Sequence, residues 1–133
     1  KHCGWYPDRK LRLWDKNKGA WGGKNPHDKY LLKEPATSAY IKGNLLHYSF
    51  YTTEQHDQQI EKFTDYSAQA AFEEGKRSSL LALLIKPMWK FIHSYIIKAG
   101  FLDGYYGWVI CRKSTYAKYL KYQKLRNIQR NVG

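Results

Sequence analysis

The sequence predicts an α+β fold, with short antiparallel strands over about residues 5–50 followed by three or four helices over about residues 53–125. Two observations support this prediction. Apolar and polar residues alternate early in the chain, which is the period of a strand with one buried face. Beyond Thr52, apolar residues recur at helical spacing, and capping residues and glycines divide this part into segments. We therefore divide the chain into a strand region, 1–51, and a helical region, 52–133.

The first expected strand ends at Trp14. Leu11 and Leu13 fall on one side of an alternating run, and Lys10, Arg12 and Trp14 fall on the other. This pattern is typical of a half-buried strand.

The segments that follow are expected to be mostly turns and loops. Residues 15–19 have the composition of a turn, and the glycines and the proline in 19–33 predict a loop. A short strand is expected over 39–41, followed by a tight turn over 42–44. A second well-marked strand is expected over Leu45–Phe50.

Two helices are expected next. Residues 52–55 fit a capping box, which predicts a helix that begins there and ends near Gly75. Ser78 or Ser79 is the expected N-cap of the second helix. Pro87 is expected to kink that helix or divide it in two.

A last helix is expected from about Tyr105 to about Leu125. Gly100 is a suitable stop for the helix before it, and Asp103 is a suitable N-cap. We expect the tail after Arg126 to be frayed.

The formal net charge is +12, and nearly all of the excess lies in the second part of the chain. Residues 1–75 hold eleven Lys and Arg against ten Asp and Glu, whereas residues 76–133 hold twelve against Asp103 alone. Such asymmetry indicates an anionic partner, either a phosphate-bearing polymer or a membrane surface.

The two cysteines, Cys3 and Cys111, are too few for a metal cluster, and their spacing does not suggest a disulfide framework. We expect reduced thiols in a cytosolic protein. The chain opens with polar residues and without Met or the apolar run of a signal peptide, and we expect it to be a fragment of a longer protein.

The stretch 80–101 is apolar on most of its circumference, with Lys86, Lys90 and His93 on one narrow polar stripe. Because charged residues and a proline interrupt it, an interfacial helix fits better than a transmembrane span, which needs about 20 predominantly apolar residues. Packing against the rest of a larger protein or a second copy explains the same apolar face. The two interpretations are compatible on different faces.

Several motifs in order resemble the C-terminal half of bacterial family-2 glycosyltransferases, with the nearest likeness to those that build the lipopolysaccharide core. The resemblance extends from Gly4 to about Leu125. The matching segments are Gly4–Trp14 (Gly-Trp-Tyr-Pro-Asp-Arg-Lys-Leu-Arg-Leu-Trp), His27-Asp28, Gly43–Phe50 (Gly-Asn-Leu-Leu-His-Tyr-Ser-Phe), Gly75-Lys76, Gly100–Gly104 (Gly-Phe-Leu-Asp-Gly) and Gly107.

The resemblance implies a cytoplasmic enzyme, peripheral at the inner face of the cytoplasmic membrane. It would transfer a sugar from a nucleotide-sugar to a lipid-linked saccharide with inversion at the anomeric carbon. Those enzymes have a GT-A fold whose N-terminal half holds a divalent ion, Mg²⁺ or Mn²⁺, on an Asp-x-Asp motif. This chain has no Asp-x-Asp, so residues 1–51 would be acceptor-side strands of a truncated catalytic domain. On its own, the fragment would bind no metal and be inactive.

The resemblance also implies roles for three polar residues. Direct displacement requires a base at the acceptor hydroxyl, and the family's His-Glu motif corresponds here to His27-Asp28. Asp28 is the expected base, or else a loop carboxylate that caps a turn. His27 either orients Asp28 or contacts a phosphate, or is an ordinary loop histidine. His47 is a candidate metal ligand, with a hydrogen-bonded core histidine as the alternative.

Four further residues are candidates for substrate binding. Arg9 and Arg12 offer planar guanidinium groups that suit a diphosphate or an acidic sugar, although solvated arginines on a strand face explain them equally. Trp14 and Trp21 lie near the expected base in sequence, and their rings suit stacking on a pyranose of the acceptor.

Two function classes compete with the enzyme. The basic last helix with its tyrosines suits a nucleic-acid-binding module, but no nucleic-acid motif is present, and we expect no nucleic-acid partner. The other alternative is a non-catalytic domain for membrane docking or dimerisation. Open strand edges and apolar helix faces predict self-association of the fragment.

Overall fold

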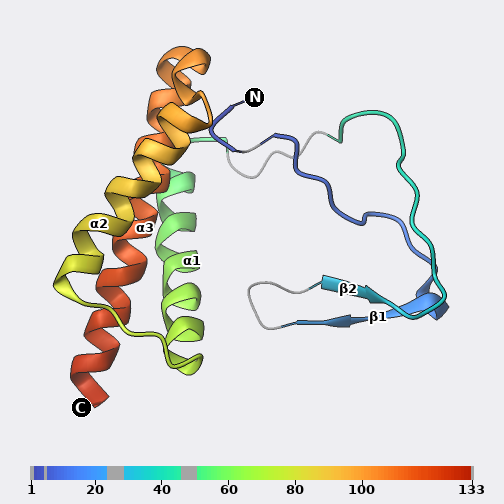
Figure 1. The fold of residues 1–133 in the computed structure, drawn as a ribbon, viewed down its shortest axis with the longest axis horizontal. Coiled ribbons are helices and arrows are strands. Elements are labelled where there is room, and N and C mark those ends of the chain that lie inside the picture. The colour runs from blue at the N-terminus through green and yellow to red at the C-terminus, as the bar shows by residue number, and fades with distance from the viewer. Residues whose placement is uncertain (1, 5, 24–28, 46–50, 133) are drawn as a thin grey trace.

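The computed structural model describes residues 2–4, 6–23, 29–45 and 51–132. The fold is α+β, as predicted, with one two-stranded antiparallel sheet followed by three helices (Figure 1). The elements are β1 (Gly19–Gly22), β2 (Lys29–Leu32), α1 (Thr53–Glu73), α2 (Leu80–Ile92) and α3 (Gly104–Val132), with a π-helical turn at His93–Ile97 and 3₁₀ helices at Lys16–Lys18 and Gly100–Asp103. In Figure 1 the hairpin lies to one side of the helices.

The hairpin lies in the segment that was expected to be a loop, so the prediction for residues 19–33 was wrong. β1 and β2 pair antiparallel, with Trp21 opposite Tyr30. Glycine at position 19 permits this pairing, because a Cβ there would lie 2.4 Å from the ring of Tyr30. Glycines that appear to interrupt a strand in the sequence are therefore what allows a large ring to lie across it.

The strands expected elsewhere are not confirmed. Residues 8–15 have no regular secondary structure, and neither have residues 39–41. The strand expected over Leu45–Phe50 lies almost entirely outside the described residues. Asp15 begins the expected turn, since its carboxylate accepts a hydrogen bond from the backbone N–H of Asn17 at 2.9 Å and caps the 3₁₀ helix.

The N-terminus of α1 confirms the predicted capping box. The hydroxyl oxygen of Thr52 accepts a hydrogen bond from the N–H of Gln55 at 3.2 Å. The side chain of Gln55 accepts one at 2.8 Å from the N–H of Tyr51, one residue before the usual position. The helix ends at Glu73, and Gly75 follows with a positive φ of 74°, as expected of a glycine after a helix.

The second helix begins where predicted but is not divided at Pro87. Ser79 is its N-cap and accepts a hydrogen bond from the N–H of Ala82 at 3.2 Å. The helix continues through Pro87 to Ile92. Pro87 is buried on the side of α2 that packs against α3, and this packing offsets the hydrogen bond that proline cannot donate.

The third helix begins about where expected and continues beyond the predicted end at Leu125, so the expectation of a frayed tail was wrong. The side chain of Gln129 accepts a hydrogen bond from the N–H of Ser78 at 3.1 Å and donates one to the carbonyl of Lys76 at 3.1 Å. Ile128 packs against the core. These contacts between α3 and the α1–α2 loop hold the last turns in helical form.

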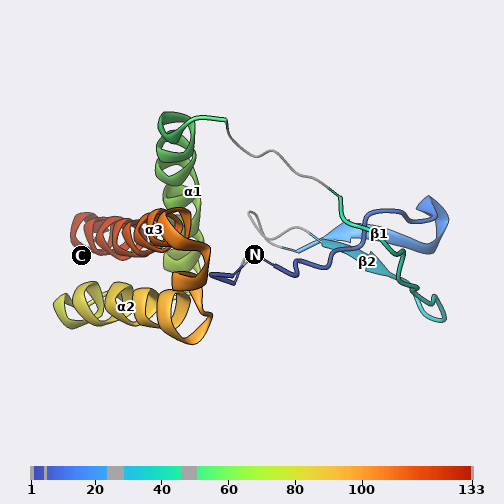
Figure 2. The ribbon, with the colours of Figure 1, turned by 90° about the horizontal axis from the view of Figure 1, so that it is seen from above.

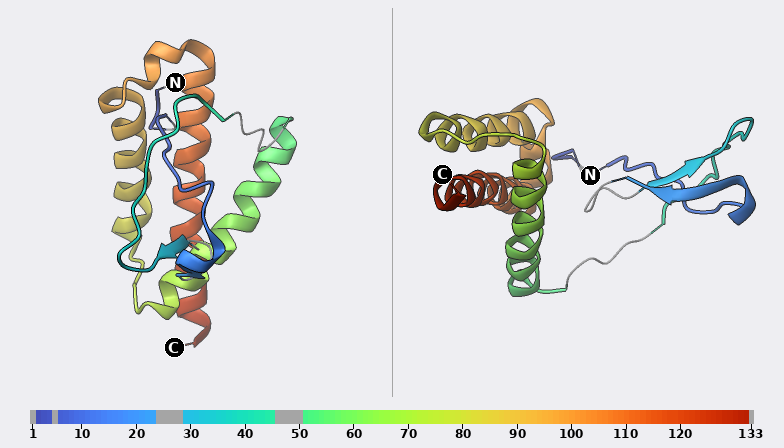
Figure 3. Two further views of the ribbon diagram at one scale, coloured as in Figure 1. Left: turned by 90° about the vertical axis from the view of Figure 1, so that its right-hand side faces the viewer. Right: turned by 90° about the horizontal axis from the view of Figure 1, so that it is seen from below.

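α3 is the central helix of the helical region. Figure 2 shows α2 running alongside α3, with α1 crossing α3 on the other side, and Figure 3 shows the same order from another direction. The core between α1 and α3 is formed by Ala68, Ala71 and Leu125, of which Leu125 is fully buried. Small residues on α1 let the two helices approach closely around this leucine.

Ion pairs join the flanks of α1 and α3. Lys124 binds Glu61 and Asp65, each at 2.8 Å, and Lys113 binds Asp57. The acidic residues of α1 therefore neutralise part of the positive charge of α3.

Candidate functional site

The hairpin brings together the two tryptophans that were predicted as a sugar site. The rings of Trp14 and Trp21 meet edge to face, with centroids 5.4 Å apart. Tyr30 completes the cluster and stacks on Trp14, with centroids 4.7 Å apart. Its hydroxyl donates a hydrogen bond to the carbonyl of Asp15 at 3.0 Å, which fixes the ring.

This aromatic cluster (Trp14, Trp21 and Tyr30) has one open ring. Trp14 and Tyr30 are half-buried against each other, whereas Trp21 is 64% exposed. An exposed indole held by two neighbouring rings suits stacking on the C–H face of a pyranose, since little side-chain freedom remains to be lost. Tyr30 was missed because its segment was interpreted as a loop. The apolar run that follows Lys29 was the signal.

The structure does not join the other predicted site residues to this cluster. The Arg9 guanidinium lies 4.9 Å from the ring centroid of Tyr40, and Arg12 is exposed. No described contact brings these two arginines together as a clamp. His27, Asp28 and His47 lie outside the described residues.

The second feature is a series of exposed apolar residues in the helical region, which we call the apolar surface. It extends from α2 through the connection to the first turns of α3, and all of its members are exposed. They are Leu80, Leu81, Leu84, Ile85, Met88, Trp89, Ile96, Ile97, Phe101, Leu102, Tyr105, Tyr106 and Trp108. Many large apolar side chains exposed in one region are typical of an interaction site.

The segment Leu80–Ile97 is, by length and composition, the one candidate membrane span among the described residues, and 11% of it is buried. The packing of α2 against α3 does not fit a transmembrane arrangement. α3 packs along α2 and carries Lys113, Lys118 and Lys124. Insertion of α2 across a bilayer would take these charges with it at high cost, whereas a position parallel to the surface would not.

A groove between α2 and α3 borders the apolar surface. We call it the lysine groove; its volume is about 290 Å³, and its lining residues are Lys86, Trp89, Lys90, His93, Lys118 and Tyr122. The polar stripe expected on α2 therefore faces α3 and a further lysine. Burial, followed by the charges of Lys121, Lys90 and Lys86, lowers the pKa of Lys118.

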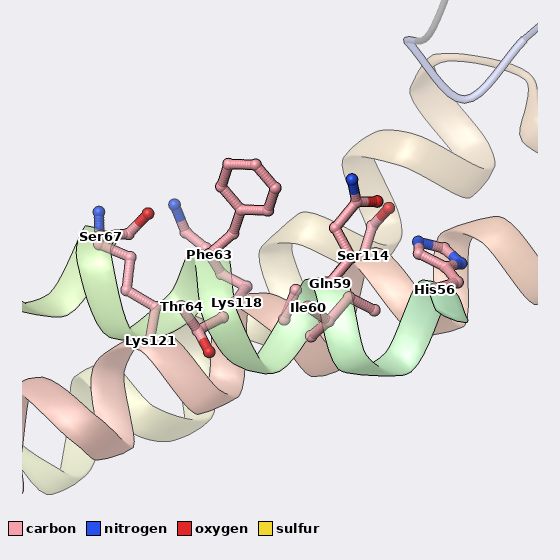
Figure 4. Close-up of a pocket in the computed structure, with 10 residues that line it drawn as sticks. His56, Gln59, Ile60, Phe63, Thr64, Ser67, Ser114, Lys118 and Lys121 are labelled. Atoms are coloured by element: carbon pink, nitrogen blue, oxygen red, sulfur yellow. The ribbon is translucent and has the colours of Figure 1, made fainter. Parts of the chain in front are cut away.

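A second groove, of about 410 Å³, lies between α1 and α3 (Figure 4). Ile60 and Phe63 of α1 give it an apolar wall, and Lys118 and Lys121 of α3 lie along its other side. Lys118 lines both grooves, so it projects from α3 between the two flanking helices. No pattern within α3 alone distinguishes Lys118 from the other lysines, and its position was missed for that reason.

The N-terminal segment is fastened to the connection between α2 and α3. His2 donates its backbone N–H to Asp103 at 2.7 Å, and its ring binds the same carboxylate at 2.8 Å. The hydrogen bond from the His2 ring, and then that from its backbone, hold the pKa of Asp103 well below its usual range. Asp103, the expected N-cap of the last helix, thus binds the N-terminal segment.

The two cysteines meet beneath this contact. Both are free and buried, and the thiol of Cys111 donates to that of Cys3 at 3.3 Å. Burial, and then the contact with Cys3, raises the pKa of Cys111 to about 12, so its thiol stays protonated. A Cβ on Gly100 would meet both thiols, and one on Gly107 would meet the carbonyl of Gly100, so the connection and α3 form a tight junction here.

The described residues hold no group of three or more His, Cys, Asp or Glu side chains that could bind a metal ion. Comparison of the chain with known protein families gives no match. Comparison with solved structures gives no match either.

Proposed function

We propose that this chain is the acceptor-side and membrane-docking part of an inverting glycosyltransferase. The enzyme transfers a sugar from a nucleotide-sugar to a lipid-linked saccharide, at the cytoplasmic face of the membrane. The proposal combines the sequence motifs with two features of the structure, the exposed apolar surface and the aromatic cluster.

The observation that carries the proposal is the apolar surface with its flanking lysines. Leu84 and Met88 are 71% and 59% exposed, so the face has no partner within the described part of the chain. Trp89 lies at its edge beside Lys86 and Lys90. Apolar residues bordered by Trp and Lys suit the boundary between the acyl chains and the headgroups of an anionic bilayer.

The aromatic cluster is the proposed contact to the acceptor sugar. Trp21 offers its exposed ring, and the chain between β1 and β2 contains His27 and Asp28. In the reaction, the carboxylate of Asp28 takes the proton of the acceptor hydroxyl while the oxygen forms its bond to the anomeric carbon. The bond from that carbon to the nucleotide phosphate breaks on the opposite side, which inverts the configuration.

The divalent ion that the family uses would stabilise the departing diphosphate. Because the family holds this ion on an Asp-x-Asp motif, which this sequence lacks, we assign the ion to the missing N-terminal half of the enzyme. No step assigned to this chain depends on it.

The membrane-docking role can be tested with a double variant of the apolar surface, Leu84→Asp with Met88→Asp, in the intact gene product that contains this chain. We expect loss of vesicle binding, and loss of transfer to a lipid-linked acceptor in vesicles. Transfer to a short water-soluble acceptor should persist. Leu13→Asp with Ile41→Asp is the control, since it adds the same two charges at residues that are 78% and 79% exposed and lie outside the apolar surface.

Two results would contradict the proposal. The first is vesicle binding that the double variant leaves unchanged, which would indicate that the apolar surface contacts another protein and not the membrane. The second is salt-sensitive oligonucleotide binding without vesicle binding, which would favour a nucleic-acid-binding module.

A further inference from the structure

Two sets of lysines lie where α3 meets its neighbouring helices. Lys113 and Lys124 pair with carboxylates of α1. Within the described part of the chain, no carboxylate pairs with Lys86, Lys90 or Lys118. Beyond Lys76 the sequence offers only one acidic residue, and that one is bound to the N-terminal segment.

The second group converges from two helices. Lys86 and Lys90 of α2 line the groove with His93, which follows α2 directly, and Lys118 projects from α3 into the same groove. Lys118 is half-buried, and its burial, followed by the charges of its neighbouring lysines, lowers its pKa. Three lysines therefore line one groove without an ion pair among the described residues, and their mutual repulsion costs stability unless an anion compensates it.

We propose that the lysine groove is a binding site for a phosphate group with two negative charges, a phosphomonoester or a diphosphate. Lysine ammonium groups bind such groups as point charges, and the ring of His93 adds a hydrogen-bond donor. The groove's volume, about 290 Å³, accommodates one headgroup of this kind.

The position of the groove favours a lipid as the source of the phosphate. Trp89 belongs both to the apolar surface and to the wall of the groove. If the apolar surface enters the bilayer, the groove lies at the level of the headgroups. This choice of source rests on the proposed function, whereas the phosphate site itself does not.

The test compares two double variants that lower the net charge equally. Lys86→Gln with Lys90→Gln alters the groove, and Lys42→Gln with Lys62→Gln removes two exposed lysines that do not line it. Glutamine retains a helix propensity close to that of lysine, and circular dichroism verifies folding of both.

The first arm measures co-sedimentation with phosphatidylcholine vesicles that contain either phosphatidic acid or phosphatidylglycerol at matched surface charge. Each groove lysine should contribute about fivefold to binding, so the groove variant should lose about 25-fold on phosphatidic acid. The control variant should lose less than the effect of one groove lysine. The native chain should prefer phosphatidic acid, because only that lipid presents a phosphomonoester.

The second arm uses inorganic pyrophosphate in solution and isothermal titration calorimetry. If the native chain binds pyrophosphate and the groove variant does not, the site accepts a soluble phosphate as well as a lipid. Binding in vesicles without binding of pyrophosphate assigns it to the lipid headgroup. Either result supports a phosphate site.

Equal losses in the two double variants in both arms would overturn the proposal, because they would show attraction by net charge alone. That result leaves the proposed function standing if Leu84→Asp with Met88→Asp still abolishes vesicle binding. Conversely, pyrophosphate binding that depends on the groove, without any vesicle binding, keeps the site and contradicts membrane docking.

Discussion

Replacing Gly107 by alanine tests how closely α3 approaches the turn that joins it to α2. A Cβ at this position would lie 1.9 Å from the carbonyl oxygen of Gly100, whereas Cβ contacts essentially never fall below 3.0 Å. The two backbones must therefore separate by about 1.1 Å, the difference between those distances. Overpacking of this kind costs about 3 kcal/mol, and the better helix propensity of alanine returns about 1 kcal/mol. We expect Gly107→Ala to lower the free energy of unfolding by about 2 kcal/mol.

Urea denaturation followed by the helical circular dichroism signal measures this loss. Gly22→Ala is the control, because its Cβ would meet only the movable end of Leu31, at 2.7 Å from Cδ1. There we expect a change of less than about 0.5 kcal/mol. Unchanged stability of Gly107→Ala would refute the close approach of α3 to Gly100 and, with it, the described orientation of α2 on α3.

Three further predictions concern charged or reactive groups. Burial lowers the pKa of Lys118, so its charge destabilises the folded chain. We expect Lys118→Met to raise the free energy of unfolding at pH 7 by about 0.5 kcal/mol, a small value because the side chain is only half-buried. In urea titrations at rising pH this gain should shrink as the folded-state lysine loses its proton, and it should vanish only above the ordinary pKa of 10.5, where the lysine is neutral in both states. Cys3 and Cys111 should resist iodoacetamide at pH 8 in the folded chain and react in urea, because both are buried and burial keeps the thiol of Cys111 protonated. Mass spectrometry measures the labelling, and rapid labelling without denaturant would contradict their burial. Asp103→Asn should destabilise the chain at pH values above 3.8, the ordinary carboxyl pKa, because His2 holds the pKa of Asp103 below that value. The difference in unfolding free energy between the variant and the native chain should narrow as the pH falls below 3.8. A constant difference down to pH 2 would contradict the contact with His2.

The helical half of the fold could be predicted from the sequence because its signals are local. The capping residue of α1 and the serine that caps α2 act within one turn of their own positions. Of the two outcomes expected at Pro87, a kink or a division, the division did not occur, because the burial of Pro87 against α3, a long-range contact, keeps the helix continuous. The frayed tail failed for the same reason, since Gln129 binds the α1–α2 loop.

The strands were harder to predict, because alternation in one segment does not reveal its partner. The alternating run through Leu11 and Leu13 remains unpaired in the described structure, while the glycine-rich segment after it forms the hairpin. Trp14 and Trp21 could be proposed together from their types, but the third ring, Tyr30, required the register of the two strands. The lysine groove likewise required the packing of α2 on α3, which brings Lys118 to the stripe of α2.

The proposed glycosyltransferase reaction can be tested by assaying sugar transfer by the intact gene product. The assay contains nucleotide-sugar, a divalent ion and a lipid-linked acceptor in membranes. The comparison is between the native protein and Asp28→Asn, which keeps the size of the side chain and removes the base. We expect Asp28→Asn to abolish turnover and to retain donor binding. Unchanged turnover would contradict this expectation, and would leave this chain as an acceptor- and membrane-docking unit with the base elsewhere in the enzyme.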